Sequence, residues 1–231
     1  MSDINTNYIP LHIHSYYSIM DGLESVEDYV KRAAQLKIPA LAITDISNIC
    51  GYVKFYSACR ANGIKPIMGA EIDVIDDIGI GGVKYTHKLT LLAMDREGRQ
   101  NLYDILSNAW LRSDAGAFNA TTTYEDLSKY AKGLILLNGF RGDIGFNLVQ
   151  GRTKEALDLI AFYKKHFDDR FCFEITRTNR EGESEFEEQA LNYCLEYGIC
   201  PVATNDTMFI YGPDDVGEDG FSDFDIHDVR V

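Results

Sequence analysis

The stretch Ile9-Pro10-Leu11-His12-Ile13-His14-Ser15 places two histidines at the end of an apolar run near the start of the chain. We interpret residues 9–13 as a β-strand. Side chains two positions apart on an extended segment project to the same side, so His12 and His14 can share a metal ion. A single His-x-His pair, taken alone, is more often structural or incidental than a ligand pair. Residues elsewhere in the chain therefore have to supply matching ligands.

Beyond this stretch, apolar runs of strand length alternate with amphipathic segments of helix length, which is typical of βα units around a parallel sheet. Strands are predicted at residues 39–44, 65–74, 88–94, 133–137, 171–176 and 200–204, and helices at residues 26–36, 50–62, 101–111, 154–167 and 185–197. Ser25 is the predicted N-cap of the first helix, and Gly63 ends the second. Residues 76–85 and 113–123 are predicted as a glycine-rich hairpin and a small-residue loop. No long Pro/Gly/Ser-rich linker divides the chain, so we expect one barrel-like α/β domain.

Composition sets limits on the class of protein. With 231 residues and 45% hydrophobic content, the chain can bury a sizeable core. No apolar run approaches the roughly 18 to 20 residues of a membrane span, and the first residues lack the features of a signal peptide. We therefore expect a cytoplasmic protein without membrane contact. An odd number of cysteines without C-x-x-C spacing predicts buried thiols rather than disulfides or a zinc knuckle: Cys50, Cys59, Cys172, Cys194 and Cys200.

The net charge of −14 argues against strong direct binding to nucleic acid, because an acidic surface repels phosphates and releases no counterions on approach. Acidic residues concentrate near the end of the sequence, and we interpret residues 212–222 as a solvated acidic loop. Residues 1–8 are predicted to be a flexible tail. The charge is better suited to a protein partner than to DNA.

Polar residues follow or end several predicted strands, where parallel α/β architectures collect their chemistry. They are His12, His14, Asp21, Thr44-Asp45, Glu71, His87, Glu174 and Thr204-Asn205-Asp206. Each one, taken singly, is compatible with an ordinary strand-end or turn residue. Taken together, histidines and carboxylates from separate strands are the donors that divalent ions require. Two or three such ions could hold a phosphate and activate a water.

The order of these motifs resembles one known family. The pair of histidines is followed by Asp21-Gly22, by Ala-Leu-Ala-Ile-Thr-Asp at 40–45, by Lys-Pro-Ile-Met-Gly-Ala-Glu at 65–71, by His-Lys-Leu-Thr-Leu-Leu-Ala at 87–93 and by Ala-Thr-Asn-Asp at 203–206. From about Tyr8 to Val231 the chain resembles the polymerase and histidinol phosphatase (PHP) domain at the N-terminus of the alpha subunit of bacterial replicative DNA polymerase III. The resemblance implies a single-domain, distorted (β/α)7 TIM-like barrel. It also implies a three-metal site, which active members use for phosphoester hydrolysis.

The resemblance further implies a set of metal ligands. Six of the family's nine positions carry suitable residues, namely His12, His14, Asp21, Glu71, His87 and Asp206. Three are occupied by Ile46, Phe140 and Met208, whose apolar side chains do not coordinate a hard ion. We therefore expect no full three-metal cluster and assign no catalytic residue. One or two divalent ions, manganese, zinc or magnesium, are the expected cofactors, with little phosphoesterase activity.

The same resemblance implies a role within a replicase. The polymerase palm, thumb and fingers of the family lie downstream and are absent from these residues, so the expected role is a module that scaffolds the remainder of the alpha subunit and docks the proofreading exonuclease subunit. The alternative is an active metal-dependent phosphoesterase, either a 3′-5′ exonuclease or a pyrophosphatase. A stand-alone biosynthetic phosphatase of the same superfamily is a more distant option. Ile46, Phe140 and Met208 are the residues that separate the first two hypotheses.

Overall fold

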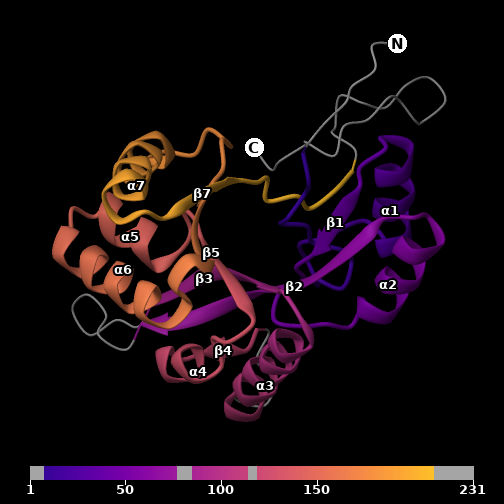
Figure 1. Ribbon diagram of the computed structural model, residues 1–231, viewed down its shortest axis with the longest axis horizontal. Coiled ribbons are helices and arrows are strands. Elements are labelled where there is room, and N and C mark those ends of the chain that lie inside the picture. The colour runs from indigo at the N-terminus through magenta and orange to yellow at the C-terminus, as the bar shows by residue number, and fades with distance from the viewer. Residues whose placement is uncertain (1–7, 77–84, 114–118, 211–231) are drawn as a thin grey trace.

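The computed structural model describes residues 8–76, 85–113 and 119–210. Figure 1 shows a strongly curled sheet that surrounds the centre of the molecule, with the helices on its outer side. Four predicted segments lie wholly or largely outside the described residues: the tail except Tyr8, the hairpin except Asp76 and Tyr85, the middle of the small-residue loop, and the whole acidic loop. Within the described residues, no helix combines the length and the apolar character that crossing a bilayer requires.

In the part of the chain that the structure describes, the sheet has seven strands in the order β1-β2-β3-β5-β6-β7, with β4 paired to β2 beside this path. The strands are β1 (Ala40–Ile43), β2 (Lys65–Asp76), β3 (Tyr85–Ala93), β4 (Thr121–Thr122), β5 (Leu134–Asn138), β6 (Phe171–Ile175) and β7 (Cys200–Ala203). Parallel pairing joins β1 to β2 and also β5, β6 and β7. The curled mixed sheet confirms the predicted α/β barrel class.

The parallel pairing expected of βα units does not extend to β3. This strand runs antiparallel to both of its neighbours, β2 and β5. Residues 77–84 connect β2 to β3, and a parallel crossover needs about a dozen residues or more. The two long strands β2 and β3 are therefore antiparallel, and they pair from Gly69 with Leu92 to Asp76 with Tyr85.

The helices cover the outer face of the curled sheet (Figure 1). They are α1 (Val26–Gln35), α2 (Tyr52–Ala61), α3 (Arg96–Arg112), α4 (Tyr124–Lys129), α5 (Asp143–Val149), α6 (Thr153–Phe167) and α7 (Glu183–Tyr197), with a 3-10 turn η2 at Asp168–Arg170. The Ser25 side chain accepts a hydrogen bond from the Asp28 amide, which confirms the predicted N-cap. Gly63 adopts φ +69 just after α2, as a residue that ends a helix often does. Sequence periodicity missed α4 and α5, which are too short to show a clear apolar stripe.

The first predicted strand, residues 9–13, is not a regular strand. Only Ile13 forms a bridge, to Thr207, and Pro10 has no amide hydrogen to donate to a ladder. The segment still links the two ends of the sheet, because the Ala42 amide donates to the Pro10 carbonyl and the His14 amide donates to the Thr207 carbonyl. Residues 9–14, together with Thr207, are called the seam below.

The apolar core has two parts. The larger part fills the space between sheet and helices and includes Tyr29, Phe55, Phe167, Phe173 and Phe186, all fully or almost fully buried. A smaller cluster is formed by Ala42, Leu92, Leu137 and Cys172. The neighbouring positions on the same face of the sheet are polar. Thr90 lies two residues before Leu92 on β3, and Glu174 lies two residues after Cys172 on β6. All five cysteines are free thiols, but Cys50 and Cys200 are exposed, contrary to the prediction of burial.

Candidate metal centre

Four predicted ligands meet where the seam crosses the inside of the sheet. One donor atom from each of His12, His14, Glu71 and Asp206 lies within 4.8 Å of the other three, and all four side chains are buried. The Nε2 atom of His12 is 3.2 Å from Glu71 Oε2, and the Nε2 atom of His14 is 3.3 Å from Asp206 Oδ1. Two imidazoles and two carboxylates form a donor set typical of zinc or manganese sites.

The position of each donor follows from its element. Glu71 belongs to β2, on which alternate residues point to the same side, so Glu71 and Asp73 share a face. The two histidines come from the seam. Asp206 follows β7, whose neighbour β6 carries Glu174. The centre is thus assembled from segments that are far apart in the sequence.

Glu174 orients His12. Its Oε1 atom lies 2.7 Å from His12 Nδ1 and also accepts a hydrogen bond from the Thr204 hydroxyl. A hydrogen bond at Nδ1 directs the Nε2 atom of the imidazole toward the centre, as carboxylates do for many metal-binding histidines. Burial alone would lower the pKa of His12, but Glu174 and Glu71 outweigh it and hold that pKa well above the ordinary value.

The pKa values of the two carboxylates of the centre, Glu71 and Asp206, are lowered by their surroundings even without a metal ion. Burial would raise the pKa of Glu71, but the hydrogen bond to His12 and the charges of His14 and Lys88 hold it far below its usual range. The pKa of Asp206 is lowered in the same way, since the contacts to the histidines and Arg141 outweigh burial. Both side chains therefore offer charged oxygens to a cation at neutral pH.

The residues fit a single divalent ion. His14 Nε2 and Asp206 Oδ1 are buried and make no hydrogen bond to the described residues, although they lie 3.3 Å apart. Two donors that each bind one ion at about 2.1 Å have roughly this separation. A buried donor and acceptor left without a hydrogen bond are costly unless another partner satisfies them. An ion held by these two atoms and by His12 and Glu71 would do so.

The other two predicted ligands do not join this group of four. Residues 87, 89 and 91 of β3 face the outer core, and the His87 ring lies 4.9 Å from that of Phe146 on α5. Asp21 is half-buried and lies close enough to Arg141 to contribute to the raised pKa of that guanidinium, after Glu71 and Asp206. Metal ligation by Asp21 and His87 stays a prediction.

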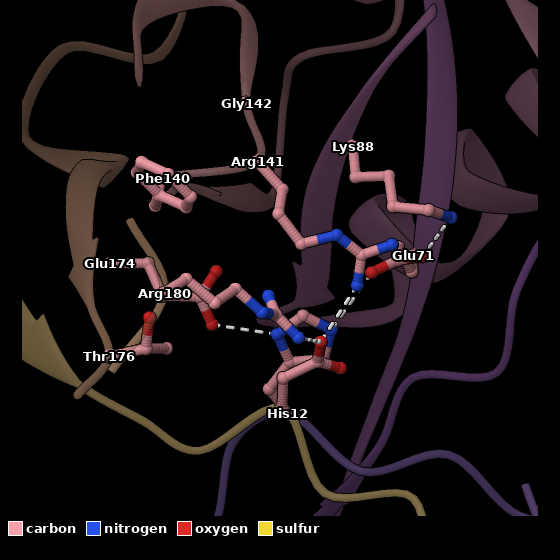
Figure 2. A pocket seen from close by; sticks show the side chains of 11 residues that line it. His12, Glu71, Lys88, Phe140, Arg141, Gly142, Glu174, Thr176 and Arg180 are labelled. Carbon is pink, nitrogen blue, oxygen red and sulfur yellow. Dashed lines mark hydrogen bonds and ion pairs between the residues drawn. The ribbon is translucent and has the colours of Figure 1, made fainter. Parts of the chain in front are cut away.

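Three cations that sequence reasoning missed lie directly at the centre. Lys88 Nζ is 2.5 Å from Glu71 Oε1, while Arg141 Nη1 and Arg180 Nη2 are 2.7 Å and 3.5 Å from Asp206 Oδ2. Figure 2 shows these side chains converging on the pocket that His12 and Glu71 line. Lys88 was recoverable from the alternation of β3, which places it beside Thr90 on the inner face. Nothing in the sequence pattern brings Arg141 or Arg180 to this site.

The three apolar replacements surround the same region. Phe140 lines the pocket (Figure 2), Met208 is buried next to Thr207, and Ile46 forms a bridge with Glu71. The pocket retains a cavity of only ≈ 20 Å³. On this scale one water molecule needs about 10–15 Å³. The centre has room for an ion and little else.

Asp45 supports the loop that follows His14. Its carboxylate accepts hydrogen bonds from the Ser15 amide (2.7 Å) and the Ser15 hydroxyl (2.9 Å), and from the Ser18 hydroxyl (2.8 Å). Burial raises the pKa of Asp45, and these hydrogen bonds oppose the shift. The Thr44-Asp45 pair singled out in the sequence therefore positions the loop and lies outside the group of four donors.

Comparisons with known proteins agree with this architecture. The DNA polymerase III subunit alpha of Escherichia coli K12 is 42% identical over 97% of this chain, and that of Vibrio cholerae is 37% identical over 100% of it. The chain spans only 18% and 19% of the lengths of these relatives. Among solved structures, a candidate metal-dependent phosphoesterase from Bifidobacterium adolescentis matches with a TM-score of 0.59 and 15% identity, covering 93% of this chain and 92% of that one.

The structural match, at that low identity, establishes the fold alone. The PHP domain family, by contrast, matches the sequence itself over residues 10–178. The matched region contains the seam histidines, Glu71, and both cations that contact Glu71 and Asp206 most closely. This chain belongs to the PHP domain family.

Proposed function

We propose that this chain is the amino-terminal PHP domain of the alpha subunit of a replicative DNA polymerase III, and that it serves there as a scaffold around a reduced metal site. The 42% identity to the E. coli subunit over nearly the whole chain supports the assignment. The proposed partners are the remainder of the alpha subunit and the proofreading exonuclease subunit, in the cytoplasm. A net charge of −14 favours a protein partner over DNA.

The size of the cavity carries the proposal of a scaffold rather than a hydrolase. A phosphoester substrate is larger than the ≈ 20 Å³ that stays free between the side chains of this pocket. Phe140, Arg141 and Arg180 line this pocket together with three of the four ligand residues, and both guanidinium groups contact Asp206. A domain whose role is to support other parts of the polymerase does not need space for a substrate.

Within this proposal, His12, His14, Glu71 and Asp206 hold one divalent ion, either manganese, zinc or magnesium. Such an ion, when bound, polarises a phosphoryl oxygen and lowers the pKa of a water. The protein itself orients His12 through Glu174 and neutralises Asp206 through Arg141. A second ion, which the sequence leaves open, would have to draw on Asp21 or His87.

Metal counting tests this site. The chelator-stripped protein is loaded with manganese or zinc, desalted and measured by native mass spectrometry, and we expect one ion per chain. The double variant His12→Ala, His14→Ala should bind none, whereas His166→Ala, which removes a histidine from α6, should bind as the wild type does. A folded wild type that binds no ion contradicts the metal site. Failure to co-elute with the exonuclease subunit on gel filtration contradicts the docking role.

The second candidate function is a working metal-dependent phosphoesterase. The four retained donors and the fold shared with a candidate phosphoesterase favour it. Hydrolysis of a nucleotide phosphoester with added manganese is the assay, with Asp21→Asn and Asp206→Asn as variants. Activity that co-purifies with the protein and is lost in both variants would replace the scaffold proposal.

A further inference from the structure

Each cationic side chain at the metal centre lies next to a carboxylate of the centre. Lys88 lies opposite Asp73 in the β2–β3 pairing, so its ammonium reaches Asp73 Oδ1 (3.3 Å) as well as Glu71 Oε1. Arg141 and Arg180 come from the loops after β5 and β6 and meet at Asp206 Oδ2. The guanidinium groups of Arg141 and Arg180 are permanently charged, and the ammonium form of Lys88 is strongly favoured. Three positive charges thus contact the carboxylates of the candidate metal centre.

Each central carboxylate uses its two oxygens differently. Glu71 directs Oε2 to the imidazoles of His12 and His14 and Oε1 to Lys88. Asp206 directs Oδ1 to His14 and Oδ2 to Arg141. One oxygen of each carboxylate therefore faces the group of four donors, and the other is taken by a side-chain cation.

This division limits how many ions the carboxylates can serve. A carboxylate that bridges two metal ions needs both oxygens, and here the outer oxygens form short, charge-assisted contacts with nitrogen. The side chains of Lys88 and Arg141 are 21% and 36% exposed, so solvent screens these ion pairs only in part. A second ion would have to displace a cation and then experience its repulsion.

We propose that Lys88, Arg141 and Arg180 are built-in counter-cations, which replace additional metal ions at the outer oxygens of Glu71 and Asp206. They restrict the centre to a single divalent ion and keep the fold stable when no ion is bound. The inference deepens the proposed function and rests on its single-ion site. It assigns these three residues a role in metal stoichiometry rather than in substrate binding.

The variants Lys88→Met and Arg141→Met test the inference, because methionine keeps much of the side-chain volume and removes the charge. Lys132→Met is the matched control, since Lys132 pairs with Glu97 (3.0 Å) at an exposed position outside the centre. Calorimetric titration of the chelator-stripped full chain with manganese gives stoichiometry and Kd. Thermal unfolding with and without manganese gives a readout that is independent of activity.

We expect one manganese site in the wild type and in Lys132→Met. Lys88→Met and Arg141→Met should bind a second ion or bind the first at least about tenfold more tightly. Their thermal midpoints should rise more on adding manganese than the wild-type midpoint does, because the ion replaces a charge that the substitution removed. If Lys88→Met unfolds in chelator, manganese should restore its refolding yield.

Folded variants with wild-type stoichiometry and affinity would overturn the counter-cation proposal and leave the single-ion site intact. A wild type that binds two or more ions while Lys88 and Arg141 are present would also overturn it, as would failure of manganese to rescue an unfolded variant. A wild type that binds no ion, beside variants that do, would contradict the single-ion site but support the counter-cations. The two proposals therefore fail in different ways.

Discussion

Replacing Asp45 with alanine probes how the loop behind His14 is held. Asp45 is 1% exposed and accepts three hydrogen bonds, from the Ser15 amide and from the hydroxyls of Ser15 and Ser18. Alanine leaves these buried donors without their acceptor, at about 1–3 kcal/mol for each unsatisfied group. The cost of burying the carboxylate, visible in its raised pKa, disappears at the same time. We expect Asp45→Ala to lower the free energy of unfolding by about 3–5 kcal/mol.

Asparagine at the same position separates hydrogen bonding from charge. Its carbonyl can take the place of Oδ1, and its amide can donate to the Ser15 hydroxyl, which then accepts instead of donating. No ionised group has to be buried. Asp45→Asn should therefore remain within about 1 kcal/mol of the wild type.

Urea unfolding followed by circular dichroism, at pH 7 with chelator, measures both changes. Hydrogen exchange of residues 15–22 reports on the loop itself, and these amides should exchange faster in Asp45→Ala than in Asp45→Asn. A loss below about 1 kcal/mol in the alanine variant would refute the reasoning, since the hydrogen bonds would then contribute little. Equal losses in the two variants would show that the charge, and not the hydrogen bonding, holds the loop.

Two further predictions concern the centre and the close contact between α3 and the residue before β5. In chelator, the raised pKa of His12 adds stability that is complete below the unfolded value near 6.5 and is lost as the pH rises through the higher folded value. Relative to His12→Gln, the wild type should therefore lose up to about 1.4 kcal/mol of unfolding free energy per pH unit above pH 6.5. Urea unfolding measures this free energy, and pH profiles that run parallel for the two proteins would contradict the prediction. In Gly98→Ala, the new Cβ would lie 1.8 Å from the Gly133 carbonyl oxygen, so we expect a loss of about 1–3 kcal/mol or more in thermal or urea unfolding. Gly63→Ala, whose Cβ meets nothing within 4 Å, should cost only the roughly 1 kcal/mol of a left-handed backbone, and an equal loss in both would disprove the steric argument.

The sequence was informative wherever a local pattern decides the outcome. Apolar periodicity and Ser25 located α1, and the strand-end donors His12, His14, Glu71 and Asp206 do meet. The pairing direction of β3 depends on the length of one connection, which periodicity alone does not weigh. Motif matching does not say which side of its strand His87 occupies, and metal ligation by His87 stays a prediction.

Alternation along β3 would have answered that question. Leu89 and Leu91 lie in the core between sheet and helices, so His87 shares their side, and Lys88 and Thr90 face inward. The arginines are different, because Arg141 and Arg180 reach Asp206 from loops whose course depends on the whole fold. No local periodicity encodes such a meeting of distant loops.

The seam also sets an order of events while the polypeptide is being synthesised. His12 and its partner Glu174 are 162 positions apart, so the histidines leave the ribosome long before the residues that will surround them. Contacts with such large sequence separation form after local ones, because the chain must first close a long loop. The β2–β3 pair, which supplies Glu71, can fold before Glu174 and Asp206 have been synthesised. A nascent chain that stops short of β7 would therefore carry the histidines but never acquire the centre.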